Sequence, residues 1–375
     1  MKIQAAVLEE MGRPGPYAKA KPMVVQELDL EAPRSGEILL RIVAAGLCHS
    51  DLSVINGDRP RPVPMVLGHE AAGIVEAVGP DVHSLKVGDH VVCVFVPTCG
   101  HCSPCQQGRP ALCENGAKSN GAGEMLAGGF RLSRKGERVF HHCGVSGFAD
   151  HAVVSQHSVV KVDKELPLHI AALMGCAVLT GAGAIFNTGS VHPGATTAVV
   201  GLGGVGLAAI LGAVASGAER IVAVDTLDSK LAFAKELGAT DTFNAADPDV
   251  TAKVREATKG GVDAALEFAG SARALEFSYS ITRRGGTTVT AGLPNPKAMM
   301  QLAPVTLVAE ERTLKGSYLG SGVPTRDIPR FLGLYNRGKL PVDKLMTHRL
   351  KLGEINEGFD RLHEGQAIRQ IIDFA

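Results

Sequence analysis

Short apolar stretches separated by turn residues fill the first part of the chain and predict β-strands. The stretches are rich in Val, Ile and Ala and lie at 37–44, 72–78, 90–95 and 152–154. Turn signals separate them at Gly36, Gly79-Pro80 and Val87-Gly88-Asp89. Short strands bounded by such turns are typical of an all-β arrangement. We therefore expect an irregular, barrel-like β domain that carries long loops.

From about Thr197 the pattern changes to apolar strands that alternate with helical segments. The strand TTAVV leads through GLGGVG into a helix that runs to Ala215, and IVAVD precedes a helix at 229–237. Asp228 is placed to cap this second helix and Gly238 to end it. DTFN, VDAALEF and GTTVTAG continue the series. The alternation predicts right-handed βαβ units and a doubly wound parallel sheet.

Beyond Leu319 the pattern is mixed again, and INEGFDRLHEG has the character of one amphipathic helix. We expect this last part to rejoin the first domain. The predicted class is α/β, with one domain at 1–177 and 320–375 and a second domain, of alternating strands and helices, at 178–319.

The composition argues against two classes of binding partner, nucleic acids and membranes. The 375 residues carry 38 basic and 38 acidic side chains. A chain without net charge is poorly suited to nucleic acid or to a membrane surface, so we expect neither partner. No charged residue occurs from Ile170 to Ala218, but many glycines and His192-Pro193-Gly194 argue against a membrane span. The N-terminal residues lack the apolar core of a signal peptide, which predicts a cytoplasmic protein.

Four of the eight cysteines lie in the single run CGHCSPCQQGRPALC. They are Cys99, Cys102, Cys105 and Cys113. Four thiolates at this spacing suit a closed tetrahedral zinc site, which holds a loop and performs no chemistry. Metal binding explains the cysteines of a chain without an export signal better than disulfides do. Cys93 and Cys143 are left over, and we interpret both as small buried residues.

Three scattered residues offer a second, open zinc site. They are Cys48 in GLCHSD, His69 in LGHE and Cys176 in LMGCAVLTGAG. Two sulfurs and one imidazole leave a fourth position for water or substrate, as catalytic zinc requires.

The run GLGGVG follows a strand and opens a helix, which is the context of a dinucleotide-binding turn. Its cofactor-binding residues are expected at Gly201, Gly203, Gly204, Val205 and Gly206. Asp225 ends the next strand, where a carboxylate bonds the adenosine ribose. Because the same carboxylate would repel a 2′-phosphate, we predict NAD rather than NADP.

With these motifs in place, the chain resembles the zinc-dependent medium-chain alcohol dehydrogenases. The similarity is to the long-loop branch that includes the liver-type and the glutathione-dependent formaldehyde dehydrogenases. It runs nearly end to end through GLCHSD, GHEAAGIVEAVG, VGDHVV, the four-cysteine run, GCAVLTGAG, GLGGVG with IVAVD, and INEGFD with AIRQIIDF. The resemblance implies a GroES-like catalytic domain, a Rossmann domain that binds NAD, and two zinc ions per subunit. The loop at 115–142 and the strand-like RTLKGSYLG match its dimeric members, so we expect a homodimer joined through the cofactor domains, with a tetramer as the main alternative.

The resemblance also implies roles for single residues. Cys48, His69 and Cys176 would hold the catalytic zinc, and Ser50 would take the proton of the substrate. Asp51 would orient His69, and Glu70 would lie behind the metal. The remaining implied contacts are His49 and Arg369 to the pyrophosphate, Thr180 to the nicotinamide, Lys230 to the adenosine ribose, and Phe95 to the substrate.

Three positions depart from the family pattern. Ser53 stands where the liver-type enzymes have the histidine that ends their proton relay. Arg59 stands where the glutathione-dependent branch has an acidic residue, which argues against a glutathionyl substrate. His142 and Cys143 replace aromatic or aliphatic pocket residues, so we expect an unusually polar substrate pocket.

The leading hypothesis is an NAD-dependent zinc alcohol dehydrogenase for primary or aromatic alcohols and the matching aldehydes. A second hypothesis is oxidation of a thiol–formaldehyde adduct. A third, from another class, is a non-catalytic sensor of zinc and nucleotide.

Overall fold

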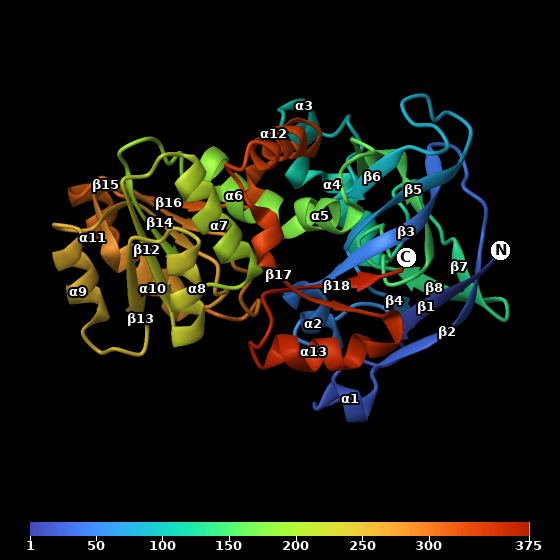
Figure 1. Ribbon diagram of the computed structural model, residues 1–375, viewed down its shortest axis with the longest axis horizontal. Coiled ribbons are helices and arrows are strands. Elements are labelled where there is room, and N and C mark those ends of the chain that lie inside the picture. Colours follow the sequence, from blue (N-terminus) through green and yellow to red (C-terminus); the bar gives the residue numbers. More distant parts are fainter. Residues whose placement is uncertain (375) are drawn as a thin grey trace. The chain divides into compact units, whose positions relative to one another are not determined.

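The computed structural model describes residues 1–374, which form two compact units (Figure 1). Unit 1 comprises 1–176, 323–329 and 346–374, and unit 2 comprises 177–322 and 330–345.

Unit 1 is built mainly from strands. Its elements are β1 (Lys2–Leu8), α1 (Tyr17–Ala20), β2 (Met23–Leu30), β3 (Glu37–Leu47), α2 (His49–Ile55), β4 (Met65–Val66), β5 (Glu70–Val78), β6 (His90–Cys93), α3 (Ser103–Gln106), η1 (Pro110–Leu112), α4 (Glu114–Ala122), β7 (Leu132–Arg134), β8 (Glu137–His141), β9 (His151–Ser155), η2 (Gln156–Ser158), β10 (Val159–Val162), α5 (Leu168–Leu173), β17 (Met346–Leu350), η7 (Leu352–Glu354), α13 (Ile355–His363) and β18 (Arg369–Asp373).

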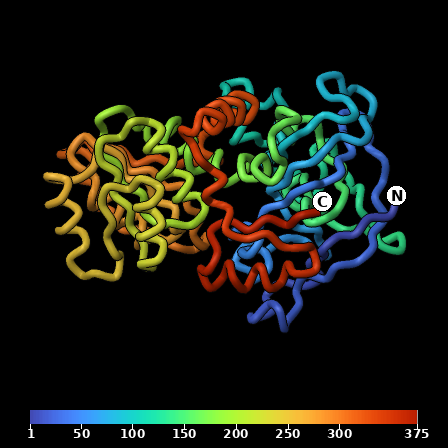
Figure 2. Tube along the Cα trace, viewed as in Figure 1, coloured from blue at the N-terminus to red at the C-terminus, as the bar shows by residue number. Residues whose placement is uncertain are grey.

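The strands of unit 1 form a closed barrel and an open sheet, which confirms the expected barrel-like β domain. The barrel has the order β1-β2-β7-β8-β4, and the sheet has the order β10-β6-β5-β3-β18-β17 with β9 also paired to β3. The C-terminal strand β18 lies antiparallel beside β3, so the last strand of the chain returns to the sheet of the first domain (Figure 2). A core of buried aliphatic residues from β3, β5 and α13 stabilises this arrangement.

Unit 2 alternates strands with helices. Its elements are α6 (Leu179–Gly183), η4 (Ala184–Thr188), β11 (Thr196–Val200), α7 (Gly204–Ala215), β12 (Arg220–Asp225), α8 (Asp228–Glu236), β13 (Asp241–Asn244), α9 (Val250–Ala257), β14 (Val262–Glu267), α10 (Ala272–Ile281), β15 (Thr282–Thr290), α11 (Pro304–Ala309), β16 (Thr313–Gly316), η5 (Leu319–Ser321) and η6 (Val342–Leu345). The segments η3 (Met174–Val178) and α12 (Pro324–Asn336) cross the division between the units.

The six strands of unit 2 pair in the order β13-β12-β11-β14-β15-β16, and every pair is parallel. The predicted doubly wound sheet is therefore confirmed. The strand order reverses its direction between β11 and β14. In such sheets the ligand binds outside the carboxyl ends of the strands at this reversal.

Two local expectations are corrected by the structure. The helix α8 has Leu227 at its N-cap position, so Asp228 does not cap it. The Asp228 carboxylate instead accepts a hydrogen bond of 2.7 Å from the Asn244 side chain. The segment Arg330–Leu345, expected in the catalytic domain, lies in unit 2. Within unit 2, the Phe331 ring packs against Phe186 with 5.7 Å between centroids.

The uncharged stretch noted in the sequence begins as one long helical run, Leu168–Thr188. This run is long and apolar enough to cross a membrane. However, 94% of its most apolar window is buried inside the structure, as in the core helix of a globular domain.

Candidate active site

The three scattered zinc-ligand candidates meet in unit 1, joined by Glu70. Cys48 follows β3 directly and precedes α2, His69 directly precedes β5, and Cys176 lies in η3. One donor atom from each of these side chains and from Glu70 lies within 4.8 Å of the others, and all four residues are buried. The Sγ atom of Cys176 lies 3.4 Å from Nε2 of His69. The sequence therefore brings together residues more than a hundred positions apart.

Cys176 is presented by an unusual piece of helix. The segment Met174–Val178 has π-helical hydrogen bonding, a feature that often marks functional sites. Gly175 lies against β6, where an added Cβ would come within 2.0 Å of the Cys93 carbonyl oxygen. A larger residue would force the backbone away from β6, so glycine is required beside Cys176.

His69 is held from three sides. Its Nδ1 lies 3.1 Å from Oδ1 of Asp51, which leaves Nε2 facing the sulfur atoms. The rings of Phe95 and His142 contact the imidazole edge to face, with centroids 5.4 and 5.6 Å away. The Asp51 carboxylate also lies 3.2 Å from Nδ1 of His142. Asp51, His69 and His142 thus form one buried polar cluster.

The donor set fits a divalent soft metal ion such as zinc. The hydrogen bond with Cys176, working against burial, lowers the pKa of the Cys48 thiol well below its ordinary value. Burial alone would lower the pKa of His69, but Asp51 and Cys48 together raise it well above its usual range. Within residues 1–374, Oε1 of Glu70 has no hydrogen-bond partner. A buried thiolate, an imidazole and an unsatisfied carboxylate oxygen are together what a zinc ion would complete.

Arg369 pairs with Glu70 in this structure. The guanidinium, at the start of β18, donates to Oε2 of Glu70, and both side chains are almost fully buried. Glu70 therefore has two neighbours of functional interest. Its Oε1 lies 3.8 Å from Nε2 of His69, a metal-ligand candidate. Its Oε2 contacts Arg369, the residue expected to bind the pyrophosphate. This pairing did not follow from the sequence, because 299 positions separate the two residues.

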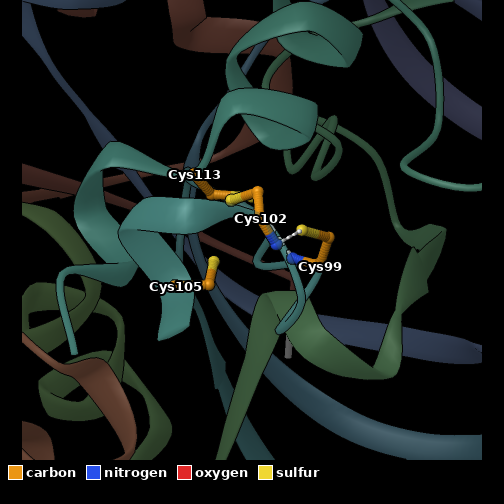
Figure 3. A group of neighbouring side chains, drawn as sticks. All are labelled: Cys99, Cys102, Cys105 and Cys113. Atoms are coloured by element: carbon orange, nitrogen blue, oxygen red, sulfur yellow. Dashed lines mark hydrogen bonds between the residues drawn. The ribbon is translucent and has the colours of Figure 1, made fainter. Parts of the chain in front are cut away.

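The four-cysteine run forms a second, separate cluster in unit 1 (Figure 3). The sulfur atoms of Cys99, Cys102, Cys105 and Cys113 lie within 4.8 Å of one another. Backbone N–H groups donate to two of them: Cys102 to the Cys99 sulfur at 3.4 Å, and Gly116 to the Cys113 sulfur at 3.3 Å. Such donation stabilises thiolates.

The charges of this cluster also suit a metal. Burial alone would raise the pKa of the Cys99 thiol. The backbone N–H groups of His101 and Cys102 oppose this effect, and the pKa falls to about 6. Burial raises the pKa of the Cys105 thiol to about 12. A tetrahedral ion that holds four deprotonated sulfurs would remove this imbalance, so the donor set fits zinc.

The nucleotide motif lies at the carboxyl ends of β11 and β12 in unit 2. Gly201 has φ of 91°, which permits the turn, and a Cβ on Gly206 would come within 1.9 Å of the Gly201 carbonyl oxygen. Gly203 and Gly204 lead into α7, and Val205 lies in its first turn. The Asp225 carboxylate accepts from the Leu202 backbone at 2.7 Å and the Leu227 backbone at 3.1 Å. A hydrogen bond thus connects the glycine turn to the Asp225 carboxylate. The backbone of this turn fits a dinucleotide.

The remaining predicted residues are placed as follows. Ser50 lies in the first turn of α2 next to Asp51, and the Ser53 hydroxyl donates to the His49 carbonyl at 2.8 Å. His49 is exposed, whereas Arg59, Thr180 and Lys230 are half-buried. Cys143 has a left-handed backbone, with φ of 55°, and its thiol contacts His142.

One residue was missed by the sequence analysis. Glu267 ends β14 as a buried carboxylate at the reversal of strand order. The signal was present as the only charged side chain in AALEFAG, an otherwise apolar and small-residue run.

Comparison with known proteins agrees with this architecture. Residues 34–164 match the family model described as alcohol dehydrogenase GroES-like domain, and residues 204–337 match that described as zinc-binding dehydrogenase. The chain is 43% identical to the NDMA-dependent alcohol dehydrogenase of Amycolatopsis methanolica over 376 aligned positions, 99% of each chain. It is 38% identical to the class-3 alcohol dehydrogenase of Drosophila melanogaster, covering 94% of this chain and 95% of that protein.

A solved structure shows the same fold. The benzyl alcohol dehydrogenase of Acinetobacter calcoaceticus matches with a TM-score of 0.93 and 36% identity, covering 100% of both chains. Together with the two family models and the full-length relatives, this shows that the chain is an oxidoreductase that belongs to the zinc-dependent medium-chain alcohol dehydrogenase family.

Proposed function

We propose that this oxidoreductase transfers hydride between a primary or aromatic alcohol and NAD, at a zinc ion held by Cys48, His69 and Cys176. The observation that carries the proposal is the buried convergence of these three donors with Glu70 within 4.8 Å. Two of the relatives support the substrate class, since one is named an alcohol dehydrogenase and one a benzyl alcohol dehydrogenase.

When bound, zinc would lower the pKa of the alcohol and NAD would accept the hydride. Three side chains around His69 hold its ring in the orientation that zinc binding requires. Asp51 fixes the imidazole of His69 so that Nε2 faces the two sulfurs. Phe95 and His142 pack on the same ring and keep it from turning. Such fixed geometry is what aligns reacting groups in an active site.

The proton released from the alcohol needs an acceptor, and we propose Ser50 for the first transfer. We expect Ser50→Ala to lower kcat by about 10²- to 10⁴-fold, the usual range for general acid–base assistance. Ser53→Ala is the matched control in the same helix. Its hydroxyl already donates to the His49 carbonyl, so its loss should change kcat little. Alcohol oxidation from pH 6 to 9 measures both, and a Ser50→Ala variant with wild-type kcat throughout would exclude this relay.

Ser53→His should raise turnover at neutral pH where chemistry limits the rate.

We propose NAD rather than NADP because Asp225 places a carboxylate beside the glycine turn. Asp225→Ser should raise the KM for NAD by about 10- to 100-fold, the worth of a hydrogen bond to a charged group, and weaken the preference over NADP. Asp228→Ser is the control, since this exposed carboxylate contacts Asn244. Steady-state kinetics with NAD and with NADP measures this preference. Equal kcat/KM for the two cofactors in the wild type would contradict the proposed preference for NAD.

The substrate is tested with a panel of primary, secondary and benzylic alcohols followed by NADH absorbance. Parallel reactions with formaldehyde plus a thiol test the second hypothesis. A third set with NDMA as added acceptor follows from the name of the Amycolatopsis relative. No turnover in any set, by a protein that binds zinc and nucleotide, would favour a sensor and overturn the proposed activity.

We also propose a homodimer through unit 2. The strand β16 is an edge of the parallel sheet, and the neighbouring α11 exposes Val305 at 67% and Val308 at 80%. An open strand edge beside exposed valines is a surface that a second copy would cover. Light scattering should give twice the subunit mass, and Val308→Glu should shift the protein toward monomer. Val87→Glu, at a 61% exposed position of unit 1, should not. A monomeric wild type at working concentration would contradict the proposal.

A further inference from the structure

Glu267 is a carboxylate that the fold buries without a cation. Its side chain is 1% exposed, and it takes part in no ion pair within residues 1–374. Burial raises its pKa, although hydrogen bonds from Thr290 and from the following backbone oppose that rise. Burying an unpaired carboxylate is costly, so its hydrogen bonds must compensate.

The carboxylate ties two loops together. Its Oε1 accepts from the Gly270 backbone at 2.5 Å, and Oε2 accepts from the Thr290 hydroxyl at 2.8 Å. The backbone N–H groups of Ala269 and Ser271 also oppose the rise in the pKa of the Glu267 carboxyl. This is more than the capping of α10, because the Ser271 hydroxyl already accepts from the Ala274 backbone at 3.1 Å.

These loops lie at the place where the sheet receives its ligand. β14 pairs with β11, and the strand order reverses between them. The loop after Glu267 packs against the glycine turn: a Cβ on Gly201 would come within 2.5 Å of the Ala269 backbone nitrogen. On the other side, the Ala291 and Gly292 backbones donate to the Glu267 carbonyl at 2.9 and 3.1 Å. Glu267 therefore connects the ends of β11, β14 and β15.

We propose that Glu267 is a positioning residue for the nicotinamide half of the cofactor. A doubly wound sheet binds one half of a dinucleotide over each half of its strands. The glycine turn and Asp225 belong to the half formed by β11, β12 and β13, which receives the adenosine part. The loops held by Glu267 and Thr290 border the other half. This inference rests on the proposed binding of NAD.

The test separates the two halves of the ligand. In Glu267→Gln an amide N–H₂ replaces one carboxylate oxygen, so a donor faces the donors of the loop. We expect the Kd for NADH to rise about 10-fold, whereas the Kd for AMP changes less than about 2-fold. Titration of the zinc-loaded protein by fluorescence and calorimetry measures both. Thr290→Val removes only one donor and should raise the NADH Kd with the same selectivity, and it replaces Glu267→Gln if that variant does not fold.

Glu37→Gln is the matched control. Glu37 is also 1% exposed but lies in unit 1, where Arg131 donates to it at 2.7 and 2.8 Å. Its substitution should lower Tm and leave the NADH Kd unchanged. An unchanged NADH Kd in Glu267→Gln, or an equal loss of NADH and AMP binding, overturns the positioning role. A wild-type protein that binds neither ligand overturns the proposed function as well, which distinguishes the two failures.

Discussion

Replacing Cys48 with alanine should lower kcat/KM for alcohol oxidation by about 10³-fold or more, because metal polarisation supplies several kcal/mol and each 1.36 kcal/mol is tenfold in rate. The side chain lies among the buried donors His69, Glu70 and Cys176, and no substitute sulfur stands in its place within the described chain. The variant should retain its fold and one zinc ion per subunit. Metal analysis together with steady-state kinetics measures both consequences.

Cys93→Ala is the matched control for this result. Cys93 is fully buried at the end of β6, and burial raises the pKa of its thiol to about 12. A thiol so reluctant to ionise is a poor metal ligand. Its removal should leave the zinc content and the turnover unchanged. An active wild-type enzyme that contains a single zinc ion would contradict the two-zinc proposal.

Replacing Cys102 with alanine should instead damage stability. A closed zinc site contributes folding free energy, and loss of a metal is among the few single changes that cost about 4 kcal/mol or more. For a unit of 150 to 250 residues this corresponds to a fall in Tm of about 8 to 16 °C. Calorimetry with parallel metal analysis should show the loss of one zinc ion. Kinetics just after preparation at low temperature should show that the remaining folded protein still turns over.

Ser103→Ala provides the comparison in the same loop. The Ser103 hydroxyl accepts from the Gln107 side chain at 3.1 Å and contacts none of the sulfurs by hydrogen bond. A substitution of this kind is usually within about 0.5 kcal/mol of neutral. If Cys102→Ala kept both zinc ions and the wild-type Tm, the four-cysteine cluster would not be a structural metal site.

Features that depend on short stretches of sequence were predictable. The parallel sheet of unit 2 follows from apolar strands that alternate with helices, and the glycine turn follows from GLGGVG in that context. The four-cysteine cluster was also visible because its ligands are neighbours in the chain. The three scattered donors were candidates by residue type, and the family resemblance then supported a convergence that spacing alone does not give.

What escaped prediction depends on long-range contacts. The pairing of Arg369 with Glu70 joins the last strand to the fifth, and no local pattern signals it. The placement of Arg330–Leu345 in unit 2 was missed because its contacts there, such as Phe331 with Phe186, join residues far apart in the sequence. Glu267 was passed over because a single carboxylate at a strand end acquires meaning only when the order of the strands is known.

The two candidate metal sites also differ in how they can assemble. The cysteines that bound the first cluster, Cys99 and Cys113, are 14 positions apart, so the loop that closes it is short. His69 and Cys176 of the other cluster are 107 positions apart. The entropy of loop closure grows with loop length, and non-local contacts form late in folding. In the proposed two-zinc enzyme, the four-cysteine run would therefore assemble its ligands by closing one short local loop. The proposed catalytic site would exist only once β3, β5 and η3 have come together, so its metallation would report on these long-range contacts.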